Sequence, residues 1–514
     1  MNRPAAAASR AWAGMAVLAL PTFLLGLDVT VLYLVLPALA ADLTPSATQA
    51  LWIMDAYGFL LAGFLVTMGT LGDRIGRRRL LMIGIAAFAA VSVFAAFAPS
   101  AETLIAARAL LGVAGATLMP STLSLVSNMF PDPRRRAVAI GVWATMFAGG
   151  MAAGPILGGV LVDSLWWGAA FLVAVPIALI VLLLGRVFLP EYRNPRGGRL
   201  DMASVALSLT AILPIVYAIK HVTADGLDAA IIVAVTVGAL AATVFWRRQL
   251  RLRDPLLDVS LFRSKAFSAA LAVLLLGLVG VGGSMYLVTQ YLQLVEGLSP
   301  FTAGLWMAPP AMAMFGAAIG APLLARRIRP GYIMGGTLAV SLIGYVLLAT
   351  AGLDAELPVA LGFAFVYLGL GAIAALGTDI VVGAAPAASS GSAASLSETV
   401  QELGLAVGVA ILGSLTTAVY RSQLAVPSGL STDQDAALRD GLSTAAAVAN
   451  ELPPGLLVDA QRAFTTGLNI ASAVAGLAIA IAAAVCLRML RHVPKLESAQ
   501  PDAAAGVAEG STTL

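Results

Sequence analysis

The stretch GFLVTMGTLGDRIGRRRLLMIG (residues 63–84) carries the pattern that decides the fold, because it joins two apolar runs through a short basic turn. The run before the turn extends back to about residue 50, and the run after it extends to about residue 98. About 20 apolar residues are enough for an α-helix to cross the ~30 Å hydrocarbon core of a bilayer. The stretch therefore predicts two membrane-spanning helices with an arginine-rich turn at the surface.

The composition of the whole chain points to the same environment. Of the 514 residues, 60% are hydrophobic and only 11% are charged, which is too apolar for a soluble globular protein. Backbone polar groups have no partner in hydrocarbon, so each apolar run is expected to cross as a helix. The sequence predicts an all-α polytopic membrane protein with fourteen spans, near residues 12–36, 50–71, 80–98, 103–127, 137–162, 166–190, 201–220, 227–247, 267–293, 301–325, 331–352, 357–383, 396–420 and 465–489.

Basic residues gather on one side of these spans. If the N-terminus is cytoplasmic, 25 of the 30 Lys and Arg residues fall in cytoplasmic segments. The positive-inside rule then predicts that both termini are cytoplasmic. The ratio of 27 Arg to 3 Lys, with abundant Ala and Gly, is typical of a GC-rich bacterium and so favours a bacterial cell membrane. The remaining basic residues are Lys220, Arg421, Arg439 and Arg462 in outer segments, and Arg108 inside a span.

The chain has a faint internal repeat. GTLGDRIGRRRLL (69–81) follows the second span and GAPLLARRIRPGYIM (320–334) follows the tenth, as expected for two related bundles. The polar segment before the last span predicts an external loop with one or two short amphipathic helices. The expected organisation is a six-helix bundle (1–190), two inserted spans (191–250), helices of a second six-helix bundle (251–420), an external loop (421–464), the last span (465–491) and a disordered cytoplasmic tail (492–514).

The basic turn resembles the signature that the major facilitator superfamily carries between its second and third helices. The matching residues are Gly69, Asp73, Arg74, Gly76, Arg77 and Arg78, while Gly72 stands where the family usually has Ala. Glycine permits a tight turn, and charges at helix ends can pair in one conformation and separate in another. The resemblance implies a gate latch, in which the Asp and the first Arg have the main part.

A second motif lies in the fifth span, in GGMAAGPILGG (149–159), and resembles the motif of the antiporter branches of the superfamily. Glycines four residues apart put one smooth stripe on a helix and let a neighbouring helix approach closely, and a proline bends the helix. A close-packing helix without a transport role would explain the glycines alone. Together the residues favour an exporter: Gly150, Gly154, Pro155, Gly158 and Gly159.

Three charged residues interrupt the apolar spans of the first half: Asp28, Asp55 and Arg108. A charge at the centre of a bilayer costs roughly 2.5 to 3.5 kcal/mol, so such residues are usually paired and functional. At ~1.5 Å per residue, all three lie roughly 8 to 12 Å from the outer ends of their helices. We expect Arg108 to be the counter-charge of Asp28 or Asp55. The alternative is that Arg108 extends its side chain to the outer interface.

The second half has its own acids, Asp379, Glu398 and Glu402, of which the last two lie one helical turn apart. A solvated helix end would explain Asp379 or Glu398, whereas Glu402 lies deeper. Aromatic side chains such as Tyr57 and Trp143 can bind cations through their ring faces, although most aromatics in spans simply pack. The candidate substrate-binding residues are therefore Asp55, Tyr57, Trp143, Glu398 and Glu402.

The resemblance narrows further with LDVTVLYLVLP (27–37) and SETVQEL (397–403), which resemble motifs of the fourteen-span drug:proton antiporters. Quaternary ammonium efflux pumps of the Qac type and their mycobacterial relatives belong to this group. The resemblance implies that Asp28 is the proton-coupling acid, that Asp55 recognises a cation or a second proton, and that Glu402 contacts the drug. The tenth span lacks the acid that can recognise divalent cations in such pumps, so broad recognition of dications is not expected.

The expected function is proton-coupled efflux of lipophilic cations by alternating access, with no cofactor and no bound metal. The expected partners are cationic small molecules, protons and the bilayer, with no nucleic acid, and the chain is expected to act as a monomer. An intramembrane enzyme is disfavoured because the two histidines, His221 and His492, lie near membrane edges and no catalytic constellation accompanies them. No lysine follows a P-loop pattern, which disfavours ATP as the energy source. A dedicated exporter of one antibiotic or metabolite remains the alternative.

Overall fold

The computed structural model describes residues 3–193, 201–225, 228–252, 255, 259–384, 390–427 and 430–495. In these parts of the chain every regular element is a helix. Fourteen helical segments are long and apolar enough to cross a membrane. The predicted all-α fold with fourteen spans is therefore confirmed. The tail expected to be disordered lies outside the described residues from residue 496 onward.

The first bundle is built from helices that start at polar caps and run through apolar sequence. Ser46 and Ser100 each accept a hydrogen bond from the backbone three residues later, which fixes the start of the second and fourth helices. Asp132 does the same for the fifth helix. The elements are α1 (Arg3–Leu43), α2 (Ala47–Ile75), α3 (Arg77–Ala96), α4 (Ala101–Met129), α5 (Pro133–Ser164), α6 (Ala169–Leu172) and α7 (Ala174–Phe188).

The inserted spans are α8 (Met202–Asp225) and α9 (Ala229–Gln249), which pack against each other. The second bundle breaks its tenth span at Met307, just before two prolines that cannot donate backbone hydrogen bonds. Its elements are η1 (Val259–Arg263), α10 (Lys265–Gln290), the π-helical turn η2 (Tyr291–Val295), α11 (Pro300–Trp306), α12 (Ala308–Ala325), α13 (Pro330–Ala349), α14 (Glu356–Gly383), α15 (Ser390–Gln423) and α18 (Leu456–Met489).

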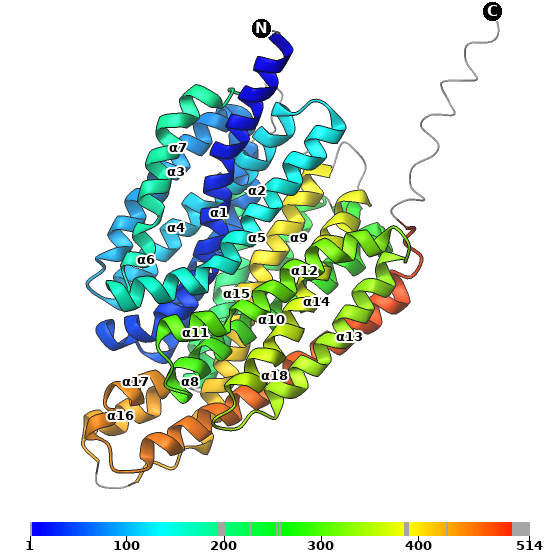
Figure 1. Cartoon of the computed structure of the whole chain (residues 1–514). Helices are drawn as coiled ribbons and strands as arrows, with labels where there is room; N and C mark the ends of the chain where they lie inside the picture. Colours follow the sequence, from blue (N-terminus) through cyan, green and yellow to red (C-terminus); the bar gives the residue numbers. More distant parts are fainter. Residues whose placement is uncertain are drawn as a thin grey trace, which may run out of the picture.

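The two ends of the molecule differ. The start of α1 and the end of α18 lie at one end, which we call the terminal side (Figure 1). The short helices α16 (Thr432–Asp440) and α17 (Leu442–Ala447) and the 3-10 turn η4 (Ala449–Glu451) lie at the opposite end, which we call the α16 side. The last span starts at Leu456, nine residues earlier than the expected 465, because α18 continues beyond its apolar part.

The two bundles meet along two seams. One seam joins α2 to α15, and the other joins α5 to α11. Helix α8 packs on both α2 and α15 and so covers the first seam. An apolar cluster fills this three-helix junction, with Phe59 from α2, Val216 from α8, and Ala406 and Ala410 from α15 at its centre. The inserted spans are thus anchored at the boundary between the bundles through α8.

Candidate functional site

A buried ion pair lies at the centre of the first bundle. Arg108 Nη1 of α4 lies 2.9 Å from Asp28 Oδ2 of α1, and the two side chains are 3% and 8% exposed. Arg108 Nε also donates a hydrogen bond of 3.2 Å to the carbonyl of Ile53 in α2. One guanidinium therefore connects three helices. The partner of Arg108 is Asp28, and its side chain does not extend to an interface.

Side chains from both bundles surround this pair. The guanidinium carbon of Arg108 lies 4.6 Å from the centre of the Tyr57 ring, in cation–π geometry. Glu402 of α15 is buried, and its charge lies close enough to interact with that of Asp28. The site thus contains one basic and two acidic groups, and one of the acids belongs to the second bundle. When both acids are ionised, this arrangement has one more negative charge than positive charge and attracts a proton or a cation.

A second buried ion pair involves a residue that the sequence analysis placed elsewhere. Lys220 Nζ lies 2.9 Å from Asp55 Oδ2, and the side chains are 0% and 1% exposed. The prediction that Lys220 lies in an outer segment is wrong, because α8 continues to Asp225 and buries it. The sequence did contain an indication of this pairing, because two acids but only one arginine interrupt the spans of the first bundle. Asp55 therefore needed a partner from outside that bundle.

The ammonium group of Lys220 has a second neighbour in α2. Its Nζ lies 4.1 Å from the centre of the Trp52 ring. Trp52 and Asp55 are three residues apart in sequence, so they lie on one face of α2 and both reach the same cation. The indole and the carboxylate therefore form a cation site, and Lys220 occupies it.

The other candidate binding residues differ in position. Glu398 is half-buried one turn before Glu402, while Asp379 of α14 is exposed. Trp143 is buried in the first bundle, where its indole donates a hydrogen bond of 3.1 Å to Thr122 Oγ1. Trp143 is thus held by α4, and Asp379 lies apart from the two buried pairs.

The basic turn makes a compact network on the terminal side. Arg77 Nη2 lies 2.8 Å from Asp73 Oδ1, and Arg78 Nη1 donates a hydrogen bond of 3.0 Å to the carbonyl of Leu189. Gly76 has φ of 112°, in the region that favours glycine, and a Cβ there would lie 2.5 Å from Glu191 Oε1. The turn between α2 and α3 is therefore tied to the segment after α7. Gly69 contacts Pro120, whose carbonyl accepts a hydrogen bond from Arg77 Nη1, with a Cβ site 3.8 Å from the Pro120 side chain.

The glycine motif of α5 faces α1. A Cβ at Gly150 would lie 2.1 Å from the carbonyl oxygen of Phe23, and a Cβ at Gly154 would lie 2.0 Å from Thr30 Oγ1. Gly158 has a similar approach to Val31, at 2.9 Å. Only glycine permits the backbones of these helices to come so close. The close approach positions Asp28, which lies on the same part of α1.

The end of the same motif contacts the other bundle. A Cβ at Gly159 would lie 2.5 Å from the carbonyl oxygen of Pro300, and one at Gly304 would lie 2.7 Å from that of Pro155. The backbone N–H of Phe301 also donates a hydrogen bond of 3.2 Å to Asp163 Oδ2. The two bundles are thus in backbone contact on the α16 side.

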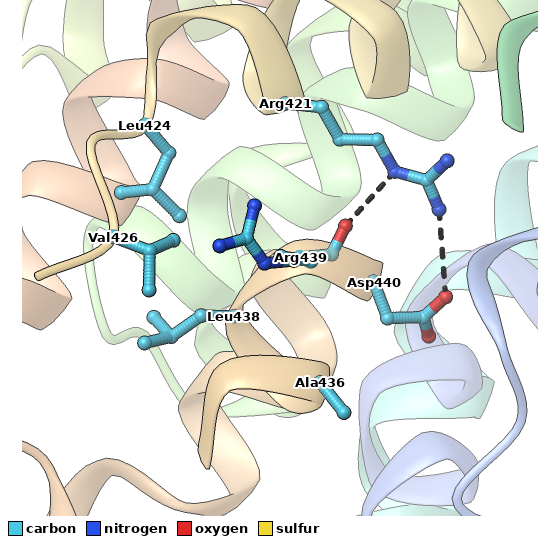
Figure 2. A pocket seen from close by; sticks show the side chains of 7 residues that line it. All are labelled: Arg421, Leu424, Val426, Ala436, Leu438, Arg439 and Asp440. Carbon is cyan, nitrogen blue, oxygen red and sulfur yellow. Dashed lines mark hydrogen bonds and ion pairs between the residues drawn. The ribbon is translucent and has the colours of Figure 1, made fainter. Parts of the chain in front are cut away.

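Helix α16 adds a polar clamp on that side. Asp440 Oδ2 accepts a hydrogen bond of 3.0 Å from the N–H of Ala47 at the start of α2, and its Oδ1 lies 3.8 Å from Arg421 Nη2 at the end of α15. Burial raises the pKa of the Asp440 carboxyl, while Ala47 and Arg421 oppose the shift. Figure 2 shows these side chains beside a pocket of about 390 Å³ between α15 and α16. Asp440 therefore links the ends of α2 and α15 on the α16 side.

A larger groove adjoins this clamp near the second ion pair. Its volume is about 680 Å³, and it opens at the α16 side. Trp52, whose ring covers Lys220, forms part of its wall. The groove is lined by Ser46, Thr48, Gln49, Trp52, Tyr217, His221, Arg421 and Asp440.

Comparisons with known proteins agree with this architecture. The multidrug efflux pump LfrA of Mycolicibacterium smegmatis is 47% identical over 447 residues, which cover 87% of this chain and 88% of the relative. The methyl viologen resistance protein SmvA of Salmonella typhimurium is 33% identical, with 86% and 90% covered. The tetracenomycin C resistance and export protein of Streptomyces glaucescens is also 33% identical, with 79% and 76% covered.

The fold has relatives among solved structures as well. A bacterial homologue of the human lysosomal transporter Spinster, in an inward-facing and unoccupied conformation, superposes with a TM-score of 0.66 at 16% identity, with 96% of this chain and 98% of that chain covered. The sequence profile of the Major Facilitator Superfamily matches residues 18–409, which is most of the chain. The protein is therefore a secondary active transporter and not an enzyme, and it belongs to the major facilitator superfamily.

Proposed function

We propose that this chain exports lipophilic cations from a bacterial cell in exchange for protons, by alternating access between its two bundles. The observation that carries the proposal is the buried pair of Asp28 and Arg108, with the buried Glu402 of the second bundle close enough to interact with Asp28. A carboxylate held in a site of low dielectric attracts either a proton or an organic cation strongly. Because both ligands need the same negative charge, they compete for Asp28.

The geometry suggests how that competition drives transport. When a proton binds Asp28, its charge is lost, and Arg108 is left with the carbonyl of Ile53 and the ring of Tyr57. When a cation binds instead, it can contact Glu402 as well, so it interacts with both bundles. The two bundles then change conformation when the site holds either a proton or a cation, and the two ligands do not occupy it together. Each cycle thus brings protons in and takes a cation out.

The sidedness of the cycle follows from the basic residues. The terminal side carries the arginines of the basic turn, and the positive-inside rule places it in the cytoplasm. The α16 side then faces outward, and the contacts between α5 and α11 close the site to the outside. In this assignment the network of the basic turn lies on the cytoplasmic side. The partners of the chain are a cationic small molecule, protons and the lipid bilayer, and the transporting unit is a monomer.

The relatives support the substrate class. LfrA is named as a multidrug efflux pump and SmvA as a methyl viologen resistance protein. The tetracenomycin C resistance and export protein favours a second candidate, an exporter dedicated to one antibiotic. The buried carboxylates favour cationic cargo. We therefore place lipophilic cations first.

Efflux of ethidium from proteoliposomes, with and without an imposed pH gradient, tests the proposal. The intact chain should export ethidium only with the gradient, and Asp28→Asn should lower the rate at least about tenfold, a barrier increase of about 1.4 kcal/mol. The matched control is Asp459→Asn, an exposed acid paired with Arg462 at the start of α18, which should export normally. If the folded intact chain moves no ethidium, a dedicated exporter of one antibiotic becomes the preferred hypothesis. If Asp28→Asn exports at the parental rate, Asp28 is not the coupling acid.

A further inference from the structure

We propose that Lys220 is a tethered competitor of the transported cation. In this view Asp55 and Trp52 form a second cation site on the route to the outside. The ammonium group of Lys220 occupies the site, and the cargo displaces it during export. The inference rests on the proposed function, and it assigns a transport role to the inserted helix α8, which supplies Lys220.

The chemistry of the site matches an organic cation. Asp55 supplies a carboxylate 2.9 Å from the ammonium nitrogen, and Trp52 supplies a ring face 4.1 Å from it. A carboxylate and an indole face both attract a substituted ammonium ion. Lys220 therefore contacts the groups that a lipophilic cation would contact.

Stability alone gives a weak reason for such a pair. Removing two charges from water costs several kcal/mol for each ion, and apolar residues of similar size are often equally stabilising in the same place. The junction between α2, α8 and α15 already has an apolar cluster, with Phe59, Val216 and Ala406 in contact. The apolar cluster already packs α8 against α2 and α15 beside the charged pair. The pair therefore suits a role in which the charges separate.

A groove lies close to Lys220, into which its displaced side chain can move. Trp52 separates the pair from the 680 Å³ groove that opens at the α16 side. The same groove contains polar side chains, among them Asp440 with its partner Arg421. The lysine side chain has four methylene groups and can swing while its backbone stays in α8. A rotation of the Trp52 ring would thus connect the site to the groove.

The displaced ammonium would also promote release. While cargo occupies Asp55, Lys220 lies nearby as a second positive charge without its carboxylate. Like charges at short range repel strongly in a medium of low dielectric. The return of Lys220 to Asp55 then expels the cargo toward the groove and leaves the site closed to the next cation from outside.

Equilibrium binding of tetraphenylphosphonium to the purified full chain, in alkaline buffer, tests this inference. Lys220→Met keeps the length and apolar stem of the side chain but removes its charge, so binding should tighten at least about tenfold. Asp55→Asn in the Lys220→Met background should reverse the gain. The matched control is Lys265→Met, because Lys265 is exposed at the start of α10 and should bind as the parent does. Unchanged or weaker binding by folded Lys220→Met would overturn the inference.

A measurement on the unaltered chain applies even where Lys220→Met does not fold. Reductive methylation with labelled formaldehyde, read by mass spectrometry, should modify Lys220 at least about tenfold faster with tetraphenylphosphonium than without it. Lys265 should react equally in both samples. Equal labelling of Lys220 in both samples, with cation binding shown separately, rejects the tethered-competitor role and leaves the proposed function standing. If the intact chain binds no tetraphenylphosphonium at all, the proposed function fails together with the inference.

Discussion

At the scale of single residues, the protein contains two buried ion pairs of different origin. Asp28 and Arg108 both come from the first bundle, whereas Asp55 takes its partner, Lys220, from an inserted helix. The arginine has further donors and also binds the carbonyl of Ile53, while the lysine is a point charge beside an indole. The first pair therefore connects three helices through one guanidinium, whereas the second connects α2 to the inserted helix α8.

This difference leads to a prediction for Arg108. Arg108→Ala leaves the buried carboxylate of Asp28 without its charge partner and should lower the free energy of unfolding by about 3 to 5 kcal/mol. Adding Asp28→Asn should recover part of the loss, because the uncompensated charge is then removed. Thermal unfolding of the purified variants measures both effects.

The control for this prediction is a surface pair of the same kind. Arg462 pairs with Asp459 at 3.2 Å, but its side chain is 66% exposed. Exposed pairs contribute about 0 to 1 kcal/mol, so Arg462→Ala should unfold close to the parental temperature. Equal stability of Arg108→Ala and Arg462→Ala would show that the buried pair does not stabilise the fold.

At the scale of elements, the contact of α1 with α5 depends on glycines of the fifth span. The motif also contains a glycine that faces away from α1: a Cβ at Gly149 would meet nothing within 4 Å. Its neighbour Gly150 has no such space, since a Cβ there would lie 2.1 Å from the carbonyl oxygen of Phe23. The close contact with α1 therefore requires glycine at position 150 but not at position 149.

Alanine substitution separates these two positions. Gly150→Ala should separate α1 from α5 and lower the free energy of unfolding by about 1 to 3 kcal/mol, a typical cost of overpacking. Gly149→Ala should be neutral or slightly stabilising, because alanine favours the helix and meets no neighbour. The comparison needs only thermal unfolding and the export rate of each variant. Similar destabilisation by both substitutions would argue against backbone contact as the cause.

At the scale of the whole molecule, two separate contacts join the bundles at the α16 side. One is the glycine contact between α5 and α11, and the other is the clamp that Asp440 makes between α2 and α15. Gly304 has no side chain and lies directly against the backbone of α5. A large side chain at this position should therefore push α5 and α11 apart. Opening of this side would then follow without any change in the buried charges.

Opening of the α16 side can be measured as an increase in the distance between the two bundles. Gly304→Leu should lengthen the separation of spin labels at Ser164→Cys, at the end of α5, and Gly352→Cys, between α13 and α14, because both positions are exposed on the α16 side. The buried native Cys486 is replaced by alanine in all samples. Gly316→Leu is the matched control, since a Cβ at Gly316 meets nothing within 4 Å. An unchanged distance distribution in Gly304→Leu would mean that this contact does not hold the α16 side closed.

The sequence by itself determined the membrane environment, the fourteen spans and the basic turn, because these depend on hydropathy and on residues close together along the chain. It also indicated that Arg108 needed an acid, since an unpaired charge in hydrocarbon is costly. Only the tertiary structure decided which acid it was, because Asp28 and Asp55 lie at similar depths in neighbouring helices. It alone placed Lys220 beside Asp55, because that contact depends on where an inserted helix packs. Spans follow from local periodicity, but the pairing of charges depends on which helices become neighbours.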